Sequence, residues 1–159
     1  LAKGYVTAAA ALLWPGGAYG DSVEGPGLLR SVAGPDPAAG AEITETVPTN
    51  ARWRLRTLRA SLVTNATVAT RAVNFIIDDG STTLLNYSGP TGQAASLTRN
   101  YYVAEYGFQP AVAGSDIFFS LPAGIAFFQG WRIRTTTTSL QAGDNWGAPQ
   151  MLVEEWIEE

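Results

Sequence analysis

Acidic side chains are the residues of this sequence most capable of chemistry. Asp78 and Asp79 stand side by side before Gly80, and Asp144 follows a glycine. Carboxylates in a loop can bind calcium, and two acids roughly 5–10 Å apart can hydrolyse a glycosidic bond. However, adjacent aspartates in a turn more often bind the backbone, and none of the 14 acids lies in a recognisable catalytic motif. We expect neither a metal site nor a pair of catalytic carboxylates.

Two residue types that are common in enzyme sites are missing. The chain has no cysteine and no histidine, which excludes disulfides, thiolate zinc sites, cysteine nucleophiles and histidine-based triads. It also has no glycine-rich phosphate loop and no nucleophile elbow. We therefore expect a non-enzymatic protein without catalytic residues and without a cofactor.

Two other motifs are candidates for binding or modification. Trp146 lies in a polar loop, where an exposed indole could serve as a platform for a sugar, although packing in the core is the commoner use of tryptophan. Asn65-Ala66-Thr67 fits the sequon for N-glycosylation, which matters only on a secretory route.

The charges point to pairing within or between proteins. The net charge is −4, so general attraction to nucleic acid is not expected. Five of the ten basic residues fall between residues 52 and 71, and the last expected strand carries several glutamates. These arginines and glutamates could pair across one sheet or between subunits, and such pairs mainly set register and choice of partner.

The strand that must position most of these arginines is residues 51–63. Its apolar and charged residues alternate, which places Trp53 and Leu55 on the inner face of an extended strand and the arginines between them on the outer face. At Thr57 the pattern slips by one residue, and a β-bulge is the feature that absorbs such a slip.

Turn signals divide the rest of the chain into short strands. We expect about eight or nine strands and no helix after residue 27, which is typical of an all-β fold, namely an antiparallel β-sandwich or jelly roll. The sandwich domain is assigned to residues 28–159. The residues predicted to lie in its core are Trp53, Leu55, Val73, Phe75, Ile77, Trp131 and Ile133.

Residues 1–27 differ from the rest and are predicted to form an N-terminal arm. Tyr5, Leu12, Leu13 and Trp14 make this segment too apolar for a freely solvated tail. It could pack on its own domain, or it could dock on a neighbouring protein or subunit. No segment approaches the ~18 consecutive apolar residues of a membrane helix, so we expect no membrane partner.

Several motifs between residues 51 and 157 together carry a resemblance to a known family. They are WRLRTLRA (53–60), TNATVATR (64–71), DDG (78–80), GWRIRT (130–135), LQAGDNW (140–146) and LVEEW (152–156). With them the chain resembles small virion structural proteins of tailed bacteriophages. Residues 1–50 lie outside the resemblance.

Among such proteins, a β-sandwich of this length is similar to capsid decoration (cement) proteins. The resemblance implies a homotrimer that binds the major capsid protein on the capsid exterior after assembly in the host cytoplasm, with no catalytic residues. The alternative is a tail or head-fibre domain that binds a host receptor or glycan, and a free carbohydrate-binding module comes third. In the leading interpretation, the capsid or subunit contacts come from Tyr5, Leu12, Leu13 and Trp14.

Overall fold

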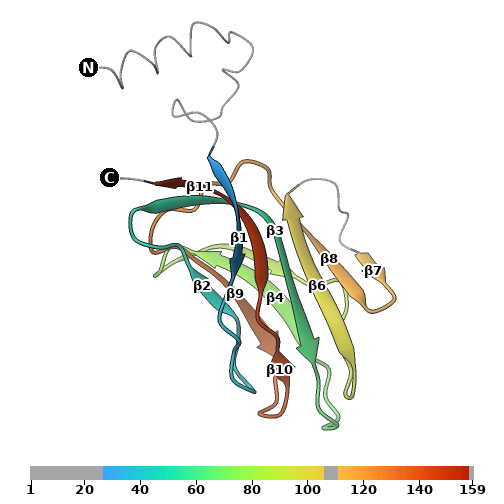
Figure 1. The fold of residues 1–159 in the computed structure, drawn as a ribbon. Helices are drawn as coiled ribbons and strands as arrows, with labels where there is room; N and C mark the ends of the chain where they lie inside the picture. The colour runs from blue at the N-terminus through green and yellow to red at the C-terminus, as the bar shows by residue number, and fades with distance from the viewer. Residues whose placement is uncertain (1–26, 106–110, 158–159) are drawn as a thin grey trace, which may run out of the picture.

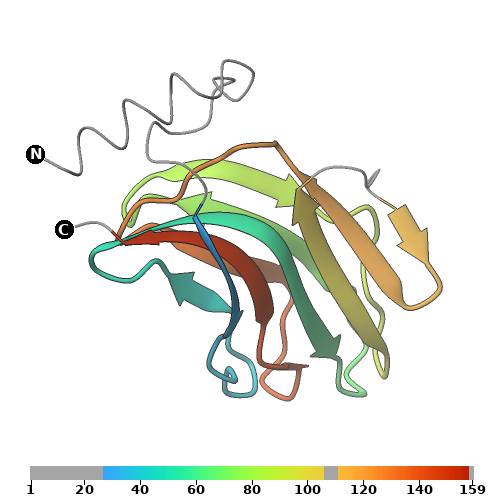
Figure 2. The ribbon, with the colours of Figure 1, turned by 45° about the horizontal axis from the view of Figure 1, so that its top comes forward.

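The computed structural model describes residues 27–105 and 111–157, which form a β-sandwich of two facing sheets (Figure 1, Figure 2). No helix occurs among these residues, and therefore none that is long and apolar enough to cross a membrane. The strands are β1 (Leu28–Ala33), β2 (Thr44–Thr46), β3 (Ala51–Val63), β4 (Ala72–Asp78), β5 (Thr83–Ser88), β6 (Thr98–Glu105), β7 (Ala111–Ala113), β8 (Asp116–Leu121), β9 (Arg132–Thr138), β10 (Asn145–Trp146) and β11 (Gln150–Ile157).

The larger sheet has the order β1-β11-β3-β6-β8-β7, with the short β10 paired to the end of β3, and the smaller sheet has the order β2-β9-β4-β5. All the paired strands are antiparallel except β6 and β8, which run parallel. The expected sandwich is confirmed, but the expectation of purely antiparallel sheets is wrong for this pair. The strand that follows β6 in the chain is β7, which lies on the far side of β8. The turn at Gly114 then brings the chain back between them as β8, which is antiparallel to β7 and parallel to β6. The strand order does not confirm a jelly roll.

The bulge expected in the long strand is present. Thr57 and Leu55 of β3 face Leu152 and Val153 of β11, so that Arg56 is the extra residue on the β3 side. Inward-facing positions continue on both sides of the bulge, and β3 bends visibly across the sheet (Figure 1). A bulge increases the local twist and bends the strand, which allows one strand to cover most of the core.

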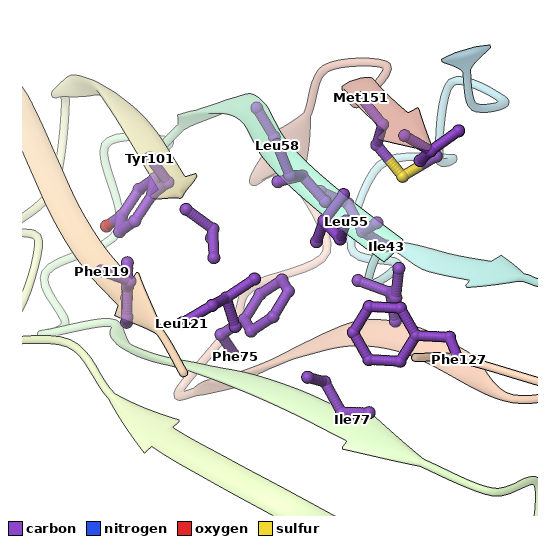
Figure 3. Close-up of a cluster of buried hydrophobic side chains, with 14 of the residues drawn as sticks. Ile43, Leu55, Leu58, Phe75, Ile77, Tyr101, Phe119, Leu121, Phe127 and Met151 are labelled. Carbon is purple, nitrogen blue, oxygen red and sulfur yellow. The ribbon is translucent and has the colours of Figure 1, made fainter. Parts of the chain in front are cut away.

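The core lies between the sheets and draws side chains from both (Figure 3). Six of the seven predicted core residues are buried. The exception is Trp131, which is only partly buried because it precedes β9 at the end of the sandwich, where its ring contacts Phe127 and Phe128. The buried positions alternate along β3, β8 and β9, as expected for strands with one solvated face, whereas the last four residues of β4 are all buried.

Candidate functional site

The predicted contact residues Tyr5, Leu12, Leu13 and Trp14 lie outside the described residues. The structure does describe the point at which their segment joins the sandwich. The amide of Gly27 donates a hydrogen bond to Oε1 of Glu154 at 2.9 Å. A Cβ atom at Gly27 would approach Glu154, the carbonyl of Glu155 and the ring of Trp156 within 2.9 Å. Only glycine fits there, so the start of the sandwich is held firmly against β11.

Exposed apolar side chains gather beside this point. Leu28 and Leu29 of β1 are 69% and 59% exposed, and Ile157 of β11 is 74% exposed. Because Leu28 pairs with Glu155 in register, the start of β1 and the end of β11 lie side by side (Figure 1). We call Leu28, Leu29 and Ile157 the junction surface. Leu28 and Leu29 are consecutive in a strand and point to opposite faces, so the junction surface wraps around the edge strand β1.

Beside the junction surface, the outer face of the larger sheet carries the arginines of β3. Arg56 pairs with Glu105 of β6 and Glu154 of β11, and Arg54 lies 3.6 Å from Glu154. The guanidinium groups of Arg52 and Arg54 lie 5.0 and 5.4 Å from the ring centroid of Trp156. The predicted pairing of arginines with the glutamate-rich last strand is therefore present within one chain, where it ties β3 to its two neighbours.

Asp78 supports the smaller sheet by binding two arginines of β9. Its two carboxylate oxygens accept hydrogen bonds from Nε of Arg132 and Nε of Arg134, and one of them also accepts the amide of Gly80. Burial by itself would raise the pKa of Asp78, but these hydrogen bonds outweigh it and hold the pKa at about 2. Asp79 binds the backbone of the β4–β5 turn, as expected for an Asp-Gly hairpin. Within residues 27–105 and 111–157, no three acidic side chains come close enough to hold a metal ion.

Asp144 forms a buried ion pair with Arg71 that the sequence did not indicate. Both side chains are fully buried, and Nε of Arg71 lies 2.8 Å from Oδ2 of Asp144. Burial alone would raise the pKa of Asp144, but Arg71 and the amides of Gln141 and Asn65 lower it below its ordinary value. The two residues are 73 positions apart, and no local pattern marks such a pair.

The remaining candidates also have structural roles. Oδ1 of Asn65 accepts a hydrogen bond from Arg71, and Nδ2, the atom to which a glycan would be attached, lies close to Gly143, where a Cβ atom would be 2.8 Å from it. Trp146 is fully buried, its ring lies 5.1 Å from that of Tyr101, and its Nε1 donates to Glu42. It is therefore a core residue and not an exposed platform for a sugar.

Comparison with models of known protein families and with curated protein sequences finds no match for this chain. The resemblance to phage virion proteins therefore stays a prediction. The structure shows that the charged side chains join strands to one another. It also shows where the junction surface lies.

Proposed function

We propose that this chain is a non-enzymatic structural protein of a bacteriophage virion, and that it binds and stabilises the head shell as a decoration protein. The observation that carries the proposal is the junction surface. Leu28, Leu29 and Ile157 are exposed where the chain enters the sandwich from an apolar N-terminal segment. The segment, through Tyr5, Leu12, Leu13 and Trp14, and this surface each carry apolar side chains that gain free energy when another protein covers them.

The ion pairs of the acidic side chains support a structural role. Asp78, Asp144 and Glu154 are each held by one or more arginines from another strand or loop. Groups held in this way stabilise the sandwich and are not positioned to transfer protons to a substrate. A rigid sandwich with a separate attachment segment suits a protein that reinforces a larger assembly.

The partners in this proposal are the major capsid protein and further copies of the chain, arranged as a homotrimer on the capsid exterior after assembly in the host cytoplasm. At about 25 cal/mol per Å², covering several hundred Å² of apolar surface contributes of the order of 10 kcal/mol before ordering costs. Many identical copies on one shell multiply a modest contact into firm attachment.

The test is removal of the N-terminal segment. A chain that begins at Gly27 is expected to fold, because Gly27 and all eleven strands are retained, and to lose most of its binding to shells of the major capsid protein. Co-sedimentation with purified shells measures the binding, and circular dichroism confirms that the truncated chain is folded. A matched variant keeps the full length but replaces Leu12, Leu13 and Trp14 by serine.

Undiminished decoration by both variants would contradict attachment through the N-terminal segment and would leave the sandwich, including the junction surface, as the place of attachment. The alternative of a fibre domain that binds a host receptor or glycan loses the aromatic platform that suggested it, because Trp146 is buried.

A further inference from the structure

Glu45 is an acidic residue at an inner-face position of an edge strand. It is the middle residue of β2, which has three residues and pairs only with β9 among the described strands. Its neighbours Thr44 and Thr46 are exposed, whereas Glu45 is buried and stands opposite Ile133. Ile43 and Val47, which flank it on the same face, are almost completely buried.

The connection between β1 and β2 covers the carboxyl group of Glu45. A Cβ atom at Gly34 would lie 2.0 Å from Oε1 of Glu45 and 2.7 Å from the ring of Pro149. The amide of Gly34 also donates to the carbonyl of Pro149 at 2.9 Å, which holds the connection in place. The carboxyl group is thus packed against the backbone of Gly34, and Glu45 is 9% exposed.

Among the described residues, no charged group offsets this burial. On β9, Arg132 and Arg134 turn to the opposite face and bind Asp78. On β1, Arg30 pairs with Glu155 of β11, and Gly34 and Pro149 carry no charge. Ahead of β2, Glu42 binds Thr135, Thr137 and Trp146. Within the described part of the chain, the carboxyl group of Glu45 has no hydrogen bond or ion pair, and burial alone raises its pKa to about 7.

We propose that Glu45 is a pH-sensitive latch, which holds β2 and the connection over it closed while its carboxyl group is protonated and loosens this edge of the sandwich when the proton leaves. An ionised carboxylate without a partner is costly to bury, and β2 is a three-residue edge strand that pairs on one side only, so it can open locally. Opening would free the edge of β9, and an unpaired strand edge can pair with another chain. This inference does not depend on the proposed virion function.

The direction and range of the pH effect follow from linkage. The pKa is about 7 in the closed state and near the ordinary 4.5 when the edge is open. The protonated carboxyl group therefore contributes its full stabilisation of the closed edge below pH 4.5, and this contribution is lost as the pH rises toward about 7. Above that, the free energy of opening changes little with pH. Within this range, the equilibrium constant for opening rises by at most about tenfold per pH unit.

Hydrogen exchange of the full-length chain between pH 5 and 8 tests the latch. After correction for intrinsic exchange rates, amides of residues 43–47 are expected to lose protection by up to about tenfold per pH unit until about pH 7. Glu45→Gln, which cannot ionise, should show no such change. Asp36→Asn removes an exposed carboxyl group from the same connection and should behave as the unmodified chain does.

Protection that is unchanged from pH 5 to 7, or that changes equally in the unmodified chain and in Glu45→Gln, would overturn the proposal. If Glu45→Gln does not fold, the carboxyl carbon of Glu45 in the unmodified chain can be titrated by NMR. A midpoint near 7 supports the latch, and a midpoint near 4.5 overturns it.

Discussion

At the scale of single residues, the Arg71–Asp144 pair shows how the sandwich closes one of its ends. The guanidinium group of Arg71 makes five hydrogen bonds, two of them to Asp144. Asp144 in turn accepts the amides of Asn65 and Gln141. A buried ion pair stabilises a protein only when its remaining polar atoms are also satisfied, and this condition is met here. The pair joins the loop after β3 to the loop before β10.

The first prediction concerns this pair. Asp144→Asn leaves the buried charge of Arg71 without a counterion and is expected to lower the free energy of unfolding by about 3–5 kcal/mol. Urea denaturation at neutral pH measures the change, with Asp36→Asn as an exposed control that should stay within about 0.5 kcal/mol of the unmodified chain. The double variant Arg71→Met/Asp144→Leu should lose less stability than Arg71→Met and Asp144→Leu do in sum. Additive losses would show that the two side chains do not act as a pair.

At the scale of elements, β3 organises the larger sheet. It pairs with β11 along its first part, with β6 along its second part and with β10 at its end. Near its start, Trp53 also forms an isolated bridge with Phe127. The bulge at Arg56 allows Leu55 and Leu58 to face inward, although they are three residues apart. Without the extra residue, a three-residue spacing would put them on opposite faces.

The second prediction compares two single-residue deletions in this strand. Deleting Arg56 removes the bulge but leaves a regular alternation in which Trp53, Leu55 and Leu58 still face inward. Deleting Arg54 shifts the strand start by one residue and turns Trp53 outward. We therefore expect the Arg56 deletion to fold and the Arg54 deletion to lose several kcal/mol more stability. Urea denaturation and the wavelength of tryptophan emission measure both effects, and equal losses would contradict the role assigned to the bulge.

At the scale of the whole molecule, the two sheets share one hydrophobic core. Leu55 and Leu58 from the larger sheet and Phe75 and Ile77 from the smaller sheet belong to the same buried cluster (Figure 3). Neither sheet can bury its apolar face without the other, so the sandwich is expected to unfold as a unit. The proposed opening of β2 is the exception, because β2 is a three-residue edge strand, and its opening would expose Ile43 and Val47 of this cluster.

The third prediction tests this cooperativity. Thermal unfolding followed by far-ultraviolet circular dichroism and by tryptophan fluorescence should give coincident transitions. Trp53→Ala should shift both by the same amount, because it removes a buried ring and is expected to cost about 3–5 kcal/mol. Two separated transitions, or a shift in only one of the signals, would show that the sheets unfold independently.

The sequence by itself determined the features that depend on neighbouring residues. Period-two alternation identified most of the strands and most of the core, the slip at Thr57 located the bulge, and the adjacent aspartates before Gly80 marked the turn between β4 and β5. These patterns are readable because they reflect backbone geometry within a few residues.

Only the tertiary structure decided the features that depend on residues far apart in the chain. They include the parallel pairing of β6 with β8, the burial of Trp146, the Arg71–Asp144 pair and the position of Glu45 beneath Gly34. A polar residue has the same local pattern whether it lies in water or under another strand. Its environment, and therefore its pKa and its role, is set by which segments fold against it.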